Sequence, residues 1–385
     1  MKRLLVCKCK TTFQLLGEEH FADCSIEAGE QLIEADTICI NEIDSSSMRE
    51  EIKAWLTPKE IDKNRVFQYM NSCLQKCKQS NVMMTLAVEE NRIYKQFGNT
   101  SEKKEKYYTV TYNLFSESSG KSFANEFLVF DELDQDAENS LFAKVMDEIA
   151  WNNMQLVEYE KNQKQWIFSA QAAGFFFHEC IGHLLEEEQF VLSDYRVGDV
   201  LFQSPISIIE NYETTLERDD CGADVVSNLP IVERGKIVNI ITAYQMPYSG
   251  NAYTQEAYAE PLARMNAMYV KASKTEDNIV SNVAEGVFIR EISSGEYNPI
   301  NGEIGLVISK ANKIKNGILC ECYQQINLLF NIKDLLGADI SLSNNYCMVN
   351  SLCGKRGTTK KITYHVPEMK IDWRKNGKCI EDRYF

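Results

Sequence analysis

The chain has 385 residues, of which 44% are hydrophobic and 25% charged, and its formal net charge at pH 7 is −15. These values are typical of a globular protein, and the length indicates two domains at roughly 150 residues each. The excess of acidic residues argues against a nucleic-acid partner, because phosphate contacts are made mainly by Lys and Arg. No stretch approaches the ~20 apolar residues needed to cross a bilayer, so we expect no membrane association.

The cysteines and the first residues indicate a cytoplasmic protein. Thirteen cysteines are an odd number, and their irregular spacing along a long chain fits reduced thiols better than a set of extracellular disulfides. The apolar run near Met1 is interrupted at once by Lys8 and Lys10. No small-residue cleavage site follows, so we do not expect a signal peptide.

The N-terminal part alternates between strand and helix patterns. Short apolar and polar alternations predict strands within the first 35 or so residues. Thr57 as N-cap, Pro58 at the first helical position and Glu60 three residues after the cap predict a helix from 57 to 78. An antiparallel meander is then predicted, followed by a second long helix with a 3.6-residue period. The expected strands are 81–88, 92–97, 107–114 and 124–130, and the second helix is 137–157.

A polar stretch at 160–165 divides this part from a region with a different pattern, so we expect domains at 1–160 and 161–385. A strand at 166–169 leads into an apolar helix that begins near Ala172. Two β-hairpins are predicted further on, with turns at 233–236 and 315–317. The predicted fold class is therefore α+β: an N-terminal α/β domain with antiparallel strands and two long helices precedes a β-rich domain that carries the apolar helix.

That helix contains the strongest motif in the chain. Two of the four histidines, His178 and His183, lie five residues apart, with Glu179 beside the first. Composition alone would give this pattern in roughly fewer than one such chain in a hundred. In zinc peptidases two helix histidines hold the metal and an adjacent Glu acts as base. Residues i and i+5 lie ~140° apart on an α-helix, so we expect a π-type bulge or unwinding at 180–183, permitted by the backbone freedom of Gly182.

A plain buried helix is the alternative explanation, but two histidines and a glutamate would then leave several polar groups without partners in an apolar environment. A catalytic zinc site also needs a third protein ligand. His20 and His365 are candidates. Cys353 is better suited chemically, because neighbouring cations favour the thiolate, and Cys347 is its local competitor.

The run 172–186, around this motif, resembles the signature of the TldD/PmbA family. Other segments that resemble the family are Asp219–Gly222, Glu233–Ile237, Tyr258-Ala259 with Arg264-Met265-Asn266, and Cys353-Gly354-Lys355. The resemblance implies that His178, His183 and Cys353 bind Zn²⁺ and that Glu179 is the catalytic base. The chain departs from the family pattern at Asn266, where Thr is expected, and at Ile292–Tyr297, which replaces a Gly-rich segment.

The resemblance further implies a zinc-dependent metallopeptidase that hydrolyses extended or unfolded peptides with low sequence selectivity, including leader-peptide removal from a modified peptide. It implies a homodimer, or a heterodimer with a TldD/PmbA-type subunit. Glu186 would either orient a ligand histidine or be an ordinary surface carboxylate, and the run Glu186–Glu188 predicts a solvated helix end. The remaining candidates for ligand orientation or substrate contact are Asp219, Asp220, Arg264 and Asn266.

Two other functional classes remain open. A non-catalytic partner or scaffold subunit of a peptide-processing complex would hold little zinc and leave peptides uncleaved. A thiol-based redox or metal-storage protein would instead use the pairs Cys7/Cys9 and Cys320/Cys322, although the chain lacks a Cys-x-x-Cys motif.

Overall fold

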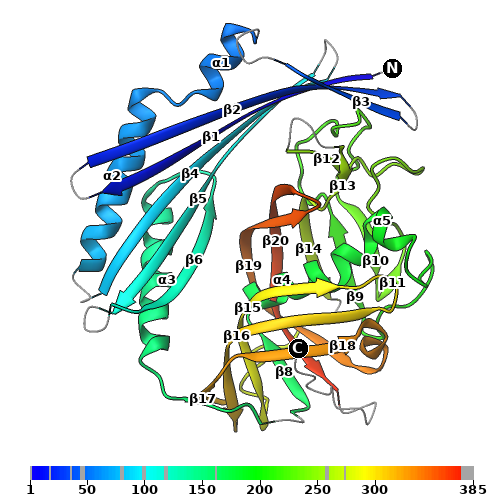
Figure 1. Cartoon of the computed structure of the whole chain (residues 1–385). Coiled ribbons are helices and arrows are strands. Elements are labelled where there is room, and N and C mark those ends of the chain that lie inside the picture. Colours follow the sequence, from blue (N-terminus) through cyan, green and yellow to red (C-terminus); the bar gives the residue numbers. More distant parts are fainter. Residues whose placement is uncertain are drawn as a thin grey trace.

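The computed structural model describes residues 2–16, 19–34, 37–43, 48–78, 82–97, 101–116, 120–160, 163–255, 260–272 and 275–373. It is a mixed α+β fold, as predicted, with most of its elements in strands (Figure 1). The N-terminal elements are β1 (Lys2–Leu16), β2 (Glu19–Glu34), β3 (Thr37–Glu42), α1 (Glu50–Leu56), α2 (Glu60–Lys78), β4 (Val82–Phe97), β5 (Ser101–Ser116), β6 (Ser122–Phe130) and α3 (Gln135–Asn152).

The remaining elements alternate short helical turns with a large set of strands. They are β7 (Leu156–Val157), β8 (Gln165–Phe168), α4 (Ala170–Phe177), η2 (His178–Gly182), η3 (His183–Leu185), α5 (Glu187–Phe190), β9 (Ile206–Glu210), β10 (Leu229–Glu233), β11 (Lys236–Ile237), β12 (Ala252–Tyr253), β13 (Leu262–Ala263), β14 (Ala267–Ala272), β15 (Glu285–Tyr297), β16 (Glu303–Lys315), β17 (Ile318–Tyr323), β18 (Ile326–Asn331), η4 (Ile332–Gly337), β19 (Asp339–Lys355) and β20 (Thr358–Asp372).

The N-terminal strands form one antiparallel sheet in the order β3-β2-β1-β4-β5-β6. Helices α2 and α3 cover one face of this sheet (Figure 1). Alternate strand residues such as Val88 and Val110 point into the same core as Met70 of α2 and Leu141 of α3. The predicted antiparallel meander is therefore confirmed, and so are the two long helices.

The element boundaries differ from the predicted ones where a polar group has an unexpected partner. The stretch between 88 and 92 does not interrupt β4, because buried Glu90 forms an ion pair with Arg92, which also donates from Nη1 to the carbonyl of Trp55 at 2.8 Å. Two predicted strands are thus one continuous strand. Polar residues are tolerated inside a strand when their charges are paired.

Both long helices are also shorter than predicted. Thr57 does not cap α2. It is the C-cap of α1 instead, and its backbone N–H donates to the carbonyl of Lys53. Helix α1 itself was not predicted. The second helix ends at Asn152, and Leu156–Val157 pairs in parallel with β17 instead. Strand pairing with a distant segment therefore overrides the helical period at the end of this stretch.

The C-terminal strands form a second sheet with the main order β11-β10-β9-β14-β20-β8-β15-β16-β17-β7, in which β18 also pairs with β16 and β19 with β20. Both predicted hairpins are confirmed. Their turns use left-handed residues, Arg234-Gly235 and Asn316-Gly317, whose φ angles lie between 49° and 84°. Two residues with positive φ are typical of the type I′ turns that match strand twist.

Ion pairs that are largely shielded from solvent join helix α3 to the second sheet. Lys144 of α3 pairs with Glu291 of β15, and Lys310 of β16 pairs with Glu148 of α3. Removing one partner of such a buried pair costs about 3–5 kcal/mol, because the other charge is left without compensation. Among the described residues no helix is long and apolar enough to cross a membrane. The division at residue 160 remains a proposal; the first sheet lies before it, whereas the second sheet includes β7 (Leu156–Val157) as well as strands after it.

Candidate metal centre

The helix that leads into the His-Glu motif is anchored at its start and along its length. Ser169 Oγ accepts the amide of Ala172 at 3.1 Å and donates to the carbonyl of Arg290 at 2.7 Å. Gly174 lies so close to Tyr364 of β20 that an added Cβ would be 2.9 Å from its Cδ2 atom. The helix is therefore held directly against the sheet.

The helix becomes a π-helical turn at the motif itself. The amide of His183 donates to the carbonyl of His178, five residues earlier, over η2. This widened turn brings the two imidazole rings to one side, with centroids 4.5 Å apart and planes at 68°. The predicted distortion is confirmed, although it begins two residues earlier than expected.

Gly182 permits this turn for a different reason from the predicted one. Its φ of −59° and ψ of −53° are ordinary helical values, so no special backbone freedom is used. An added Cβ would instead lie 2.1 Å from Met265 Sδ and 3.1 Å from Met268 Cε. Gly182 is required because the backbone packs directly against two methionines.

We expect Gly182→Ala to lower the free energy of unfolding by about 1–3 kcal/mol, because the added methyl group overpacks this contact. Urea unfolding of the purified variant measures the effect. Gly354→Ala is the matched control, since an added Cβ there meets nothing within 4 Å. Equal losses in both variants would contradict the packing explanation.

Cys353 meets the two histidines from the other side, on β19 near the tip of the β19–β20 hairpin. Its Sγ lies 3.5 Å from His183 Nε2, and one ligand atom from each of His178, His183 and Cys353 lies within 4.8 Å of the others. Tetrahedral zinc with Zn–N near 2.0–2.1 Å and Zn–S near 2.3 Å would place a nitrogen and a sulfur ~3.5 Å apart. The donor set and its spacing thus fit a zinc ion.

The hairpin that carries Cys353 is held by Arg264, which is 1% exposed. Its Nη2 donates to the carbonyl of Cys353 at 2.5 Å, and its Nη1 donates to the carbonyl of Thr358 at 3.0 Å. One guanidinium therefore bridges the two strands of the hairpin. This planar, two-point contact fixes the backbone at the sulfur.

The electrostatics favour an anionic sulfur. Burial acts to raise the pKa of the Cys353 thiol, but His178 and His183 outweigh it and lower the pKa to about 4. Burial acts to lower the pKa of His183, yet Glu186 and Cys353 raise it well above the ordinary value. Burial raises the pKa of Glu179, against the opposing effect of the two histidines. A carboxylate with a raised pKa is suited to accept a proton.

Glu179 itself lies between the imidazoles. Its Oε1 is 3.8 Å from His178 Nε2, and its Oε2 is 3.9 Å from His183 Nε2. The opposite side of Glu179 is occupied by Gly295 of β15, where an added Cβ would be 2.9 Å from Glu179 Cγ. Only a glycine at this strand position leaves room for the carboxylate.

Glu186 holds the second histidine from behind. Its Oε2 is 2.9 Å from His183 Nδ1 and accepts from Lys355 Nζ at 2.7 Å, and its side chain is fully buried. Lys355 also donates to Glu188 at 2.9 Å. Because Lys355 follows Cys353 on the hairpin, this contact fastens the sulfur-bearing strand to the histidine-bearing turn.

The prediction of a solvated end at Glu186–Glu188 is therefore wrong. Glu187 is also buried, and its Oε2 accepts the amides of Ala243 and Tyr244 at 2.6 and 3.2 Å. Glu188 accepts the amide of Ala263 at 3.1 Å. A run of like charges is buried here because backbone amides and one lysine satisfy it.

We expect Lys355→Met to weaken zinc binding by roughly 10- to 100-fold, the range seen when partners of metal ligands are removed. The dissociation constant from competition with a chromophoric chelator measures this loss. Lys355→Arg should restore part of the affinity, and Lys333→Met, at an exposed ion pair with Asp194, should bind zinc like the wild type. Unchanged affinity in Lys355→Met would show that the contact does not support the site.

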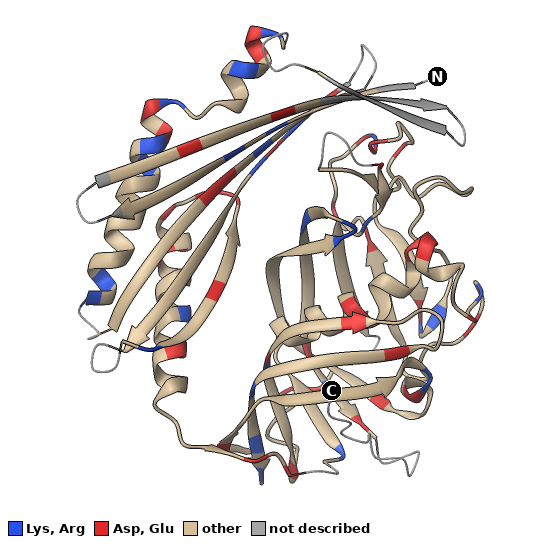
Figure 2. Ribbon diagram, in the orientation of Figure 1, with Lys and Arg blue, Asp and Glu red and all other residues tan. Residues whose placement is uncertain are grey.

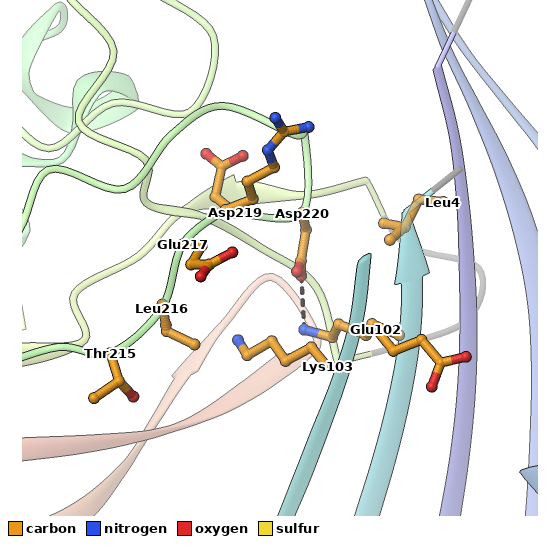
Figure 3. Close-up of a pocket in the computed structure, with 10 residues that line it drawn as sticks. Leu4, Glu102, Lys103, Thr215, Leu216, Glu217, Asp219 and Asp220 are labelled. Carbon is orange, nitrogen blue, oxygen red and sulfur yellow. Dashed lines mark hydrogen bonds and ion pairs between the residues drawn. The ribbon is translucent and has the colours of Figure 1, made fainter. Parts of the chain in front are cut away.

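The acidic pair Asp219 and Asp220 does not join this group of ligands. Asp219 accepts the amides of Cys221, Ala223 and Ala252 at 2.9–3.0 Å. Asp220 pairs with Lys95 of β4 at 2.7 Å, as the dashed line in Figure 3 shows. Asp219 therefore stabilises a turn, and Asp220 joins this turn to β4 of the first sheet.

Asn266 belongs to a buried polar network next to the site. Its backbone N–H donates to Glu210 Oε1 at 2.5 Å. Its side-chain Nδ2 donates to Asn211 Oδ1 at 2.5 Å, and its side-chain Oδ1 accepts from Lys360 Nζ. Burial raises the pKa of Glu210 to about 7. Tyr258-Ala259, which also resembles the family, lies outside the described residues.

The other third-ligand candidates have different neighbours. His20 stacks on Phe67 with centroids 4.6 Å apart, and His365 packs among tyrosines. Cys347 is exposed. A second group of possible ligands in the described part of the chain, Glu126, Glu148 and Glu291, already has Lys144 and Lys310 as counter-ions, so it resembles a charge-balanced contact rather than a metal site.

The sequence did not predict the contacts of three residues that shape the centre. Lys355 was visible beside Cys353-Gly354, but its carboxylate partners were not. Gly295 could have been noticed as a glycine inside a strand. Tyr364, whose ring centroid is 5.4 Å from that of His178, carries no local signal, because its contact depends on how α4 packs on β20.

The histidine, cysteine and glutamate constellation on this fold is of the kind used by metallopeptidases. The family model of the PmbA/TldA metallopeptidase C-terminal domain matches residues 162–373. The chain belongs to the TldD/PmbA family.

Its relatives carry metalloprotease names. The chain is 25% identical over 225 residues to the zinc metalloprotease TldD homolog of Saccharolobus solfataricus, covering 55% of this chain and 51% of that protein. It is 25% identical over 268 residues to the metalloprotease TldD homolog of Haemophilus influenzae, covering 63% and 54%. The chain thus spans about half the length of the curated relatives it matches.

Among solved structures, TldE from Thermococcus kodakarensis is similar with a TM-score of 0.71 and 13% identity, over 96% of this chain and 95% of that chain. A putative modulator of DNA gyrase from Bacteroides thetaiotaomicron gives a TM-score of 0.66 at 11% identity, over 96% and 93%. At these identities the likeness concerns the fold. It extends over both large sheets of the chain.

Proposed function

We propose that the chain is a zinc-dependent metallopeptidase that hydrolyses extended or unfolded peptides with low sequence selectivity. The observation that carries this proposal is the convergence of His178, His183 and Cys353, which are separated by up to 175 sequence positions, with the Glu179 carboxylate between the imidazoles. Two imidazoles and one thiolate form a three-ligand set that leaves a fourth position free. The zinc metalloprotease name of a relative supports the choice of metal.

Bound zinc would supply Lewis acidity and lower the pKa of a water molecule towards ~7. The protein's own residues provide the rest of the proposed chemistry. Glu179 accepts the proton from the attacking water and passes it to the leaving amine, for which its raised pKa is suitable. Glu186 orients His183 through Nδ1, so that Nε2 points toward Cys353.

A free strand edge lies beside Glu179, and it is suited to bind an extended peptide. β15 pairs with β8 only over Val287–Ile289, whereas its pairing with β16 continues to Tyr297. Within the described residues, the later part of β15 therefore has one unpaired edge, and Gly295 on it contacts Glu179. Main-chain hydrogen bonds to such an edge hold a peptide with little selection of side chains.

The proposal includes leader-peptide removal from a modified peptide as one use of this activity. It also includes a cytoplasmic location, expected from the thirteen cysteines, and a dimer of two copies or with a related subunit. The names of the relatives and of the TldE structure are consistent with such a peptide-processing pair.

Metal analysis and digestion of a peptide mixture test the proposal together. The purified chain should hold about one zinc per protomer and cleave unfolded peptides, and a chelator should stop cleavage. His183→Ala should hold little zinc and cleave nothing. A folded wild-type protein that holds no zinc and leaves all peptides intact would instead support the non-catalytic subunit.

A further inference from the structure

Two cysteines lie against each other on β1 and β2, which run side by side in the first sheet (Figure 1). Cys9 of β1 is 1% exposed, whereas Cys24 of β2 is exposed. Their Sγ atoms are 2.8 Å apart. Because the S–S bond of a disulfide is ~2.0 Å long, a shift of less than ~1 Å would bring the two sulfurs to bonding distance.

The register of the two strands explains this approach. Cys9 directly faces Ile26, and Cys24 directly faces Thr11. The cysteines are therefore diagonal neighbours on the same face of an antiparallel pair. Diagonal backbone positions lie near the upper limit of separation for a disulfide. The side chains close the remaining gap, as the short distance between the sulfurs shows.

This spacing does not suit a metal ion. Two thiolates on one tetrahedral zinc ion, each with Zn–S near 2.3 Å, would be about 3.8 Å apart. Among the described residues, neither sulfur belongs to a group of three ligand atoms of the kind that His178, His183 and Cys353 form. Cys7, the partner of Cys9 considered from the sequence, lies two residues away on the same strand, which is ~7 Å along the chain. The close pair is therefore Cys9 with Cys24.

The two thiols differ in reactivity. Burial raises the pKa of the Cys9 thiol to about 12, and the contact with Cys24 acts in the same direction. Lys10 follows Cys9 in the sequence, but successive strand residues point to opposite faces. It pairs with Glu89 at 2.7 Å, among the charges of both signs that Figure 2 shows on this sheet. An oxidant from solution therefore meets Cys24 first, because Cys24 is exposed and Cys9 is a buried, neutral thiol.

We propose that Cys9 and Cys24 form a reversible disulfide when the protein meets a small-molecule disulfide such as oxidised glutathione. The Cys24 thiolate attacks one sulfur of the oxidised glutathione, whose S–S bond breaks and releases one glutathione. Cys9 then loses its proton, and its Sγ attacks Cys24 Sγ and releases the second glutathione. Two protein thiols are thereby oxidised by two electrons, and one glutathione disulfide is reduced to two thiols. The inference depends on contacts within the first sheet and not on the proposed peptidase function.

Oxidation of the full-length protein, purified in the presence of zinc, tests this site. The protein is incubated with mixtures of oxidised and reduced glutathione, free thiols are alkylated, and the digested protein is analysed by mass spectrometry. We expect the peptides that contain Cys9 and Cys24 to be joined to each other. This link should exceed the mixed disulfide of Cys24 with glutathione by on the order of tenfold, because the second thiol is held beside the first. A strong thiol reductant should restore both thiols.

Two results would overturn the inference. In one, Cys24 stays joined to glutathione while Cys9 remains a free thiol in the folded protein. In the other, the link between the two peptides forms only in urea, which would show that the native strands hold the sulfurs apart.

Variants assign the link to these two thiols. Cys9→Ser should trap Cys24 as the mixed disulfide with glutathione, because the second thiol is missing, and Cys24→Ser should leave Cys9 reduced, because Cys9 is buried. If Cys9→Ser does not fold, Cys9→Ala keeps a small apolar side chain at this position and should give the same trapping. Cys347→Ser, at an exposed thiol of the second sheet, is the matched control and should keep the link. Oxidation of Cys9 in folded Cys24→Ser, through Cys7 or another thiol, would refute the pairing.

The link should stabilise the protein and leave the metal centre intact. A cross-link restricts the unfolded chain, so urea unfolding of the linked protein should shift to higher concentration, and Cys24→Ser should show no such shift. Because Cys353 lies on β19 in the second sheet, the zinc content should not change on oxidation. Unfolding at lower urea, or loss of zinc with Cys353 joined to another thiol, would contradict the proposal. A protein that cleaves no peptide would remove the peptidase and leave this disulfide unaffected.

Discussion

Glu179→Gln is expected to reduce peptide hydrolysis by at least ~100-fold while leaving the zinc content of the protein unchanged. Loss of a general base typically costs about 10²–10⁴ in rate, and the amide cannot accept the proton of the attacking water. The histidines and Cys353 keep their own contacts, because the carboxylate oxygens of Glu179 are no closer than 3.8 Å to the imidazole nitrogens.

Rate measurements with a quenched fluorescent peptide, combined with zinc analysis of the same preparation, test this expectation. Glu285→Gln, the same replacement at an exposed position at the start of β15, is the matched control and should behave like the wild type. Full activity of Glu179→Gln would remove Glu179 as the base. Loss of zinc along with activity would show that it supports the metal centre instead.

Cys353→Ser is expected to weaken zinc binding by more than ~100-fold and to abolish activity at limiting zinc. Loss of an outer partner already costs about 10- to 100-fold in affinity, and here a ligand itself is removed. Serine keeps the size of the side chain, but a hydroxyl does not ionise as the Cys353 thiol does, whose pKa is lowered to about 4.

Chelator competition gives the zinc affinity of this variant. Cys347→Ser, at an exposed thiol on the same strand, should bind zinc like the wild type, so the pair of variants separates the two cysteines of β19. Equal affinity in Cys353→Ser and the wild type would rule out the sulfur as a ligand. An equal loss in both variants would indicate damage to the strand.

The sequence predicted the elements whose causes are local. The i, i+5 spacing of the histidines predicted either a π-type bulge or local unwinding, because residues five apart lie ~140° apart on a regular α-helix, and η2 is the π-type turn. The hairpins at Gly235 and Gly317 were predicted because glycine readily adopts the positive φ that such turns require. The choice of Cys353 among the candidate third ligands combined the charge of its sequence neighbours with the family resemblance, but in the structure His178 and His183 lower the pKa of the thiol, and Lys355 pairs with Glu186 and Glu188.

The features that were missed depend on partners distant in the chain. The run Glu186–Glu188 is predicted to face solvent. In the structure, Lys355 and the backbone amides of residues 243–244 and 263 form hydrogen bonds with its carboxylates away from solvent. Gly182 is required by Met265, 83 positions later. The polar centre of β4 is only partly of this kind: Arg92 pairs with Glu90 two residues earlier, and its distant contact is with the carbonyl of Trp55. Local propensity carries no information about contacts of this kind.

The distance in sequence between the donors has a consequence for biogenesis. His183 and Cys353 are 170 residues apart, and the sulfur reaches the imidazoles only when the β19–β20 hairpin is complete. While the chain is still emerging from the ribosome, only the imidazole donors exist. Under the proposed ligand assignment, the three donors are therefore present together only after β19 has been synthesised.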